Sequence, residues 1–298
     1  MDFVLEFERP IVELQKRIAA LREIERTSGT DLSASIEQLR QNAESLQKEI
    51  FSTLTPWQRA LLSRHPGRPY TMDYVDRLFT DWTELHGDRA GHEDCSLIGG
   101  LARFGNTPIM VIGHQKGRNT KENIRRNFGM PRPEGYRKAL RLMQMANRYG
   151  RPIVTFIDTP GAFPGIDAEE RGQAEAIARN IMEMATFTVP IICCVIGEGG
   201  SGGALAIGVG NRVMMLENAI YSVISPEGCA AILWRDRAEG PKAASALRIT
   251  ATDCLRFSVV DTVVKEPEGG AHRNQEETID AVGKALRKHL TALLKMSP

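Results

Sequence analysis

The feature of this sequence that most suggests chemistry is a cluster of five glycines within the seven residues 197–203. A structural turn needs one or two glycines, because glycine buries no side chain and loses more conformational entropy on folding than other residues. The surplus predicts close approach of the backbone to a ligand, with free N–H groups at the start of a helix facing negative charge. We therefore expect an anion-stabilising turn between a buried strand and a helix. Its residues are Gly199, Gly200, Ser201, Gly202 and Gly203.

Two known motifs overlap on this turn and predict other chemistry. Gly197, Gly199 and Gly202 match G-x-G-x-x-G, but the following acid, Glu217, comes earlier than the roughly 20 residues typical of a dinucleotide site. Gly199, Ser201 and Gly203 match the G-x-S-x-G nucleophile elbow of serine hydrolases. The latter is the stronger alternative, and its triad could be completed by the residues Asp236, Asp253 or Asp261 with His272.

A second glycine turn is expected after the apolar run at residues 153–157. Asp158, Thr159, Pro160 and Gly161 resemble a GTPase motif, but the chain has no G-x-x-x-x-G-K-[ST] sequence for binding phosphate. Glycine turns at comparable ends of two strands favour two walls of one pocket. The residues expected in this second wall are Gly161, Ala162, Phe163 and Gly165.

Nine lysines and arginines lie between residues 116 and 141, with two acids among them, in a chain whose net charge is only +1. Such a segment favours binding of a phosphorylated or carboxylated small substrate, with Lys116, Arg125 and Arg126 as candidate contacts. RNA binding is the alternative, and it is disfavoured because only Phe128 and Tyr136 could stack on bases.

Composition and local patterns limit the remaining classes. The near-zero net charge provides no overall attraction to nucleic acid or membranes. The five cysteines form no C-x-x-C pair, so we expect no metal in this chain and a reducing, cytoplasmic location. The adjacent Cys193 and Cys194 are expected to be buried thiols. No export signal is visible, and the apolar runs are too short to span a membrane.

The elements that must position these residues follow an α/β pattern. Apolar residues spaced by three and four predict an N-terminal helical hairpin, within a first region at residues 1–64 that either packs on the body or docks to another subunit. The main domain, at residues 65–298, alternates strands and helices. Its expected strands are 95–102, 109–114, 153–157, 191–196, 213–216 and 221–224. Its expected helices are 134–148, 173–186, 204–209, 226–234 and 275–294.

Over most of its length the chain resembles the carboxyltransferase alpha subunits of bacterial multisubunit acetyl-CoA carboxylase. The resemblance is carried by HQKGRNTKENIRRNFGMPRPEGYRKALRLMQMA from His114, IDTPGAFPG from Ile157, EERGQAEAIARN from Glu169, IGEGGSGGALAIGVGN from Ile196, YSVISPEGCAAILW from Tyr221 and GGAHRN from Gly269. Phe163 stands where the family commonly has tyrosine, which implies that a hydroxyl group is dispensable there.

This resemblance implies a crotonase-like superhelix of ββα units behind the helical hairpin. It implies transfer of a carboxyl group from carboxybiotin, held on a separate carrier protein, to acetyl-CoA, giving malonyl-CoA for fatty-acid synthesis. Gly202 and Gly203 match the family's backbone oxyanion hole, which would stabilise negative charge on the biotin ureido oxygen. The implied partners are a zinc-bearing beta subunit in an α2β2 assembly, the biotin carboxyl carrier protein and biotin carboxylase.

Overall fold

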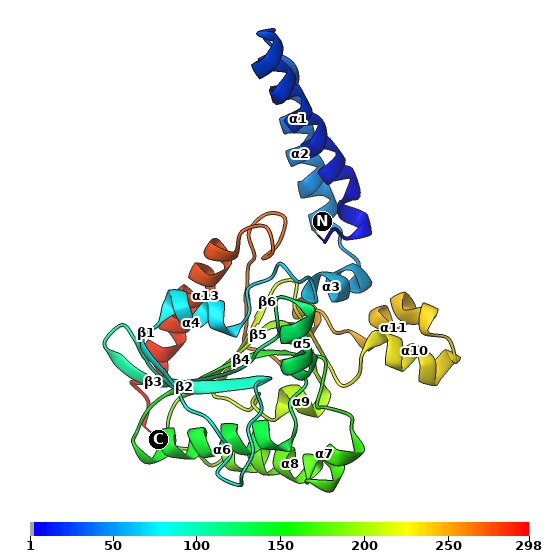
Figure 1. Ribbon diagram of the computed structural model, residues 1–298. Coiled ribbons are helices and arrows are strands. Elements are labelled where there is room, and N and C mark those ends of the chain that lie inside the picture. Colours follow the sequence, from blue (N-terminus) through cyan, green and yellow to red (C-terminus); the bar gives the residue numbers. More distant parts are fainter. Residues whose placement is uncertain (1–2, 298) are drawn as a thin grey trace.

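The N-terminal hairpin of the computed structural model, which describes residues 3–297, is formed by helices α1 (Arg9–Ser28) and α2 (Ser33–Ser52). Their apolar stripes face each other and bury Ile11, Ile18, Ile36 and Ala43. Gly29 ends α1 with a φ of 70°, a left-handed conformation that glycine adopts without steric cost. The predicted hairpin is present, and it projects from the body of the molecule (Figure 1).

Two short helices lead from the hairpin into the body. The first, α3 (Pro56–Ser63), begins with a capping box between Thr55 and Gln58 and packs Ala60 into a small apolar cluster with Ile220 and Ile249. The second, α4 (Thr71–Leu78), lies against strand β3. Residues 64–70 join these two helices.

Within residues 3–297, a mixed sheet of eight strands forms the centre of the body. Seven of them follow the order β1-β2-β3-β4-β5-β6-β8, and β7 pairs with the far end of β5. The first three strands are antiparallel, whereas the pairings from β3 onward are parallel. The strands are β1 (Thr80–Glu84), β2 (Leu97–Phe104), β3 (Thr107–His114), β4 (Ile153–Thr159), β5 (Ile191–Gly200), β6 (Arg212–Leu216), β7 (Ile220–Ser222) and β8 (Thr262–Val264).

Helices cover both faces of this sheet (Figure 1). Helix α6 packs on β2 and β3 and against α8, whereas α13 packs with α4 on the opposite face. The remaining helical segments are η1 (Glu6–Glu8), α5 (Thr120–Arg125), η2 (Asn127–Gly129), α6 (Pro133–Arg148), α7 (Ile166–Glu170), α8 (Gln173–Met184), α9 (Ser201–Leu205), α10 (Pro226–Trp234), η3 (Arg237–Glu239), α11 (Gly240–Leu247), α12 (Ala251–Arg256) and α13 (Gln275–Leu293).

The core explains why the central strands were recognisable from sequence. All seven residues of β4 are buried, as are the first nine residues of β5, since helices cover both faces of these parallel strands. Cys193 and Cys194 are fully buried and unpaired, as predicted. Among the described residues, no helix combines the length and apolarity needed to cross a membrane.

Candidate functional site

The candidate site lies where β5 ends and α9 begins. β5 ends at Gly200 and α9 begins at Ser201, so no loop residue separates the strand from the helix. Ser201 has a φ of 50°, which is strained for a residue with a side chain. The expectation of a turn beginning at Gly199 is therefore wrong, because Gly199 and Gly200 pair with Tyr221 and Ser222 of β7 as strand residues.

The glycines of this segment serve mainly to admit neighbouring parts of the same chain. A Cβ at Gly199 would lie 2.7 Å from the Tyr221 ring, and one at Gly200 would lie 2.1 Å from the carbonyl oxygen of Pro160. A Cβ at Gly203 would lie 2.5 Å from the carbonyl carbon of Gly161. Gly202 differs, because its Cβ would meet only the Ile177 side chain, at an ordinary 3.5 Å.

The second predicted turn lies directly beside the first. Thr159, at the end of β4, pairs with Gly199 of β5, and the Thr159 hydroxyl donates to the carbonyl of Gly161 at 2.8 Å. The start of α9 packs closely against Gly161 and Ala162. The structure therefore brings together the two glycine-rich segments that the sequence analysis assigned to one site.

Phe163 and Gly165 complete this second segment. The ring of Phe163 lies under the guanidinium of Arg132, whose carbon is 4.1 Å from the ring centre. Gly165 precedes α7, and a Cβ there would lie 2.5 Å from the Phe163 ring, so this glycine is needed for packing. Phe163 itself is half-buried.

The first N–H groups of α9 form no hydrogen bond within the described residues, with Gly202 half-buried and Gly203 buried. The N–H groups of Gly202 and Gly203 have no acceptor among residues 3–297, as is usual for the first turn of a helix. An apolar pocket of about 300 Å³ adjoins Ser201 on the other side, between α9, β7 and α12. Leu205, Val223, Phe257 and Val259 line this pocket and are exposed.

Lys116 contacts the ends of β4 and β5 and does not line the pocket beside Ser201. Its ammonium group is 2.7 Å from Asp158 Oδ1 and 3.2 Å from Glu198 Oε1, and its side chain is only 12% exposed. Burial would lower the pKa of Lys116, but the two carboxylates outweigh burial and raise it above its usual value. Because its charge is already neutralised, Lys116 is not a free cation for substrate, and neither acidic partner was predicted from the sequence.

Most of the other basic residues of this segment are also engaged. Ion pairs or hydrogen bonds join Arg118 to Asp73, Arg126 to the carbonyl of Cys95, Arg132 to Asp167, Arg137 to Asp88 and Lys138 to Glu93. Arg141 donates to backbone carbonyls. Arg125 is exposed and forms no ion pair within the part of the chain that the structure describes. Tyr136 is fully buried, so it cannot stack on bases as RNA binding would require.

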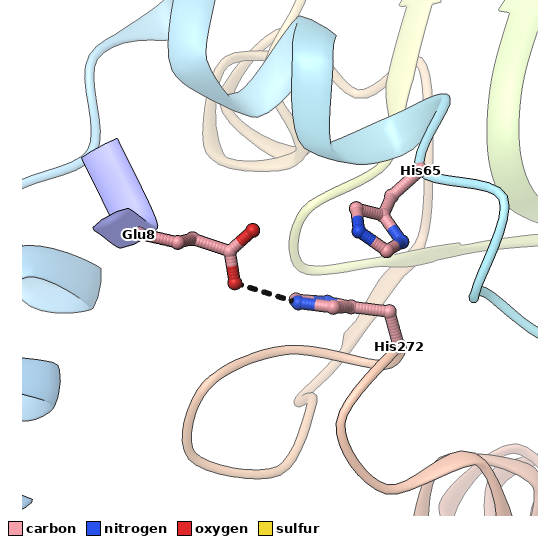
Figure 2. Close-up of side chains that lie close together, drawn as sticks. All are labelled: Glu8, His65 and His272. Carbon is pink, nitrogen blue, oxygen red and sulfur yellow. Dashed lines mark hydrogen bonds and ion pairs between the residues drawn. The ribbon is translucent and has the colours of Figure 1, made fainter. Parts of the chain in front are cut away.

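His272, the candidate base for a serine hydrolase, is engaged elsewhere. Figure 2 shows it beside Glu8 and His65, where its Nε2 donates to Glu8 Oε1 at 2.8 Å. The pocket beside Ser201 is lined by no histidine or acidic residue among those described. Ser201 has the strained conformation of an elbow but lacks the base that would activate it, so the hydrolase alternative is wrong.

The Glu8, His65 and His272 cluster is a hydrogen-bonded clasp for the N-terminal segment (Figure 2). His65 Nδ1 accepts from the N–H of Gly67 at 3.0 Å, which leaves His65 Nε2 as the donor to the carbonyl of Phe3 at 3.2 Å. Arg273 Nη2 lies 3.1 Å from Glu8 Oε1. A metal ion would have to displace these hydrogen bonds next to a guanidinium cation, so the arrangement favours the clasp over a metal site.

Comparison with known proteins supports the class that the fold and site indicate. Transcarboxylase 12S shares the fold with a TM-score of 0.59 at 21% identity, covering 75% of this chain and 42% of that one. The beta subunit of geranyl-CoA carboxylase from P. aeruginosa gives 0.57 at 19% identity, covering 78% and 43%. The fold is therefore the crotonase-like carboxyltransferase fold, as predicted.

Sequence relatives identify the family. Residues 4–298 match the model for the acetyl co-enzyme A carboxylase carboxyltransferase-like family. Acetyl-coenzyme A carboxylase carboxyl transferase subunit alpha of Syntrophotalea carbinolica is 58% identical over 298 residues, covering 100% of this chain and 94% of the relative. The Bordetella pertussis protein of the same name is 59% identical over 294 residues, covering 99% and 92%. The chain belongs to this carboxyltransferase family, and the predicted resemblance is confirmed.

Proposed function

We propose that this chain acts as the alpha subunit of an acetyl-CoA carboxylase carboxyltransferase, with Gly202 and Gly203 as its backbone oxyanion hole. When bound, carboxybiotin on a carrier protein would supply the carboxyl group that converts acetyl-CoA to malonyl-CoA. The observation that carries the assignment of the hole is the pair of N–H groups at the start of α9 that have no acceptor among the described residues. Two preorganised donors of this kind are each worth about 3 kcal/mol of transition-state stabilisation.

The surrounding residues fit a ureido group approaching these donors. Gly202 is the glycine of this segment whose missing side chain is not required by packing, so its open space can admit a ligand atom. Gly161 and Ala162 hold the start of α9 in place from the side of β4, and Phe163 offers an apolar surface beside them. Arg125 of α5, exposed and without an ion pair within residues 3–297, is the candidate cation for orienting an anionic group on the substrate.

The same geometry favours an active site shared between subunits. The pocket beside Ser201 is open and rimmed by exposed apolar side chains, which a partner surface would cover. We assign the acetyl-CoA side, the zinc and a second oxyanion hole to a beta subunit in an α2β2 assembly. The biotin carboxyl carrier protein and biotin carboxylase are proposed as further partners.

Gly202→Ala tests this proposal in the enzyme reconstituted with its beta subunit. The new methyl group occupies the approach to the donors without a clash inside the chain, since its nearest neighbour lies 3.5 Å away. We expect malonyl-CoA formation to fall about 10²-fold, because displacing a reacting group by about 1 Å has an effect of that size. The thermal unfolding midpoint should not decrease.

Ser201→Ala is the matched control at the adjacent position. It removes the hydroxyl group and keeps the backbone, so carboxyl transfer should stay within about twofold of wild type. Full activity in Gly202→Ala would refute the proposed hole. Loss of activity in Ser201→Ala at unchanged stability would instead give the hydroxyl a role that the proposal denies.

A further inference from the structure

A buried group of three charges links the ends of the two strands that carry the site. Asp158 Oδ1 accepts from Lys116 Nζ at 2.7 Å and from the N–H of Glu198 at 3.1 Å. Lys116 Nζ also lies 3.2 Å from Glu198 Oε1, and Arg64 Nε donates to Glu198 Oε2 at 2.8 Å. Asp158 lies immediately before Thr159, the last residue of β4, and Glu198 lies two residues before Gly200, the last residue of β5.

These charges lie where the backbone pairing between the two strands is irregular. Ile157 is paired with Val195, but Thr159 is paired with Gly199, so the register shifts between these pairs. Asp158 and Glu198 lie within this irregular stretch. Regular pairing fixes the relative position of neighbouring strands, so its interruption here gives side chains a part in setting the spacing of the strand ends.

The cost of burying these ionised side chains indicates that they do more than fill the space between the two strands. Burying ionised groups is costly, and apolar side chains of similar volume often hold a protein interior together equally well. Asp158 Oδ1 lies so close to Gly197 that a Cβ there would be 2.3 Å away, which shows how tightly the carboxylate is packed against β5. Lys116 is itself covered by η2, where a Cβ at Gly129 would be 2.8 Å from Lys116 Cγ.

We propose that Lys116 is a positioning residue which, through Asp158 and Glu198, sets the distance between the turn at Gly161 and the N–H donors at the start of α9. This inference rests on the proposed oxyanion hole and gives Lys116 a role in place of substrate binding. Without the ammonium group, the two buried carboxylates would lie side by side with Arg64 paired to Glu198 but not to Asp158, so they would repel and the strand ends would separate. The donors would then shift although the fold persists.

The experiment uses Lys116→Met in the complete alpha and beta enzyme. Methionine keeps the length of the stem and removes the charge. We expect kcat for malonyl-CoA formation to fall about 10²-fold, the size expected for a displacement of about 1 Å. The KM for acetyl-CoA should stay within about twofold, because the proposal places acetyl-CoA on the beta subunit.

Lys138→Met is the matched control. Lys138 is also a buried lysine, 1% exposed, and its partners Glu93 and Asp94 lie outside both turns. This variant should lower the unfolding midpoint with kcat per folded enzyme unchanged. Amide hydrogen exchange at residues 199–203 should increase in Lys116→Met and remain at the wild-type rate in Lys138→Met.

Glu198→Gln provides the second measurement if Lys116→Met does not fold. It keeps the shape of the side chain and leaves the pair of Lys116 with Asp158, so we expect about a tenfold loss in kcat at constant KM. The positioning role is refuted if the folded variants turn over like wild type, or if Lys138→Met loses as much kcat. Failure of the wild-type enzyme to make malonyl-CoA would refute the proposed function instead, and the exchange measurement would still decide the role of Lys116.

Discussion

At the scale of single residues, the glycines of residues 199–203 lack a side chain for two different reasons. Gly199, Gly200 and Gly203 lack side chains because another part of the chain occupies the space. A Cβ at Gly202 would meet only the Ile177 side chain, at an ordinary distance, and this is the position where we propose that a ligand approaches. The segment also places its left-handed residue at Ser201 rather than at a glycine. Glycine content alone therefore identifies the segment but does not say which glycine faces the substrate.

Substitution by alanine distinguishes a glycine that packing requires from one that packing does not require. Gly200 has ordinary extended dihedral angles, φ −96° and ψ 117°, so alanine meets no conformational penalty there. Its Cβ would nevertheless lie 2.1 Å from the carbonyl oxygen of Pro160. We expect Gly200→Ala to lower the free energy of unfolding by about 3 kcal/mol, the upper end of overpacking costs. Urea unfolding measures this, with Gly202→Ala as the control that should remain as stable as wild type.

At the scale of elements, a fully buried ion pair joins the segment between α3 and α4 to the segment that follows β8. Arg68 Nη2 lies 2.8 Å from Glu266 Oε1, and both side chains are at most 2% exposed. Arg68 Nη2 also donates to the carbonyl of Ile196 at 3.0 Å, and Glu266 accepts from the N–H groups of Asn218 and Ala271. Burial would raise the pKa of Glu266, but Arg68 outweighs burial and holds it below its usual value.

Replacing Arg68 alone should reduce the free energy of unfolding more than replacing both Arg68 and Glu266. Arg68→Met leaves the Glu266 carboxylate buried without a cation, so we expect a loss of about 3–5 kcal/mol in the free energy of unfolding. Adding Glu266→Gln removes the uncompensated charge and keeps one of the two acceptor oxygens that Asn218 and Ala271 use, so the charge-dependent part of the loss should be recovered. Denaturant unfolding of the single and double variants measures this. A double variant no more stable than Arg68→Met would contradict the electrostatic explanation.

The sequence predicted those elements whose side chains are buried on two faces or on one regular stripe. The strands at β4 and β5 and the helices at α6, α8 and α13 were expected close to where they lie, because apolar residues recur with a clear period. β1 was missed because it is a largely exposed edge strand with Asp81 in a left-handed conformation, and β8 because it has three residues. Neither shows an alternating apolar pattern.

The segment that forms the site could be predicted from the sequence, but the arrangement of its residues could not. The glycine cluster and the resemblance to the family indicated Gly202 and Gly203, yet Lys116 was taken for a substrate contact. Its partners are 42 and 82 positions away in the sequence. Charge in a sequence does not reveal whether a cation will be exposed or neutralised by acids from distant strands. Whether such a cation is neutralised is decided only when the folded sheet brings the strand ends together.

At the scale of the whole molecule, the hairpin of α1 and α2 projects from the body and is attached near its base (Figure 1). Leu5, Leu54 and Leu62 form a small apolar cluster there, and the clasp of Glu8, His65 and His272 lies close by. Because the two helices bury their apolar stripes against each other, the orientation of the hairpin depends on these few contacts. Conditions that weaken the clasp should therefore loosen the hairpin before the body unfolds.

Mild acid is such a condition. Burial and the nearby His272 lower the pKa of His65 to about 4, compared with 6.5 for an unperturbed histidine, so the clasp holds a neutral ring. Its contribution to stability is complete above pH 6.5 and is lost as the pH falls toward 4. Burial would raise the pKa of Glu8, but His272 and Arg273 lower it to about 2 from 4.5, so the contribution of Glu8 is lost only below about pH 4.5.

Between pH 6.5 and 4.5 we therefore expect amide exchange in residues 3–12 to increase through His65 alone, while β4 and β5 stay protected. In His65→Asn, whose side-chain oxygen can still accept from Gly67, this pH dependence should disappear, and its persistence would show that another group controls the clasp.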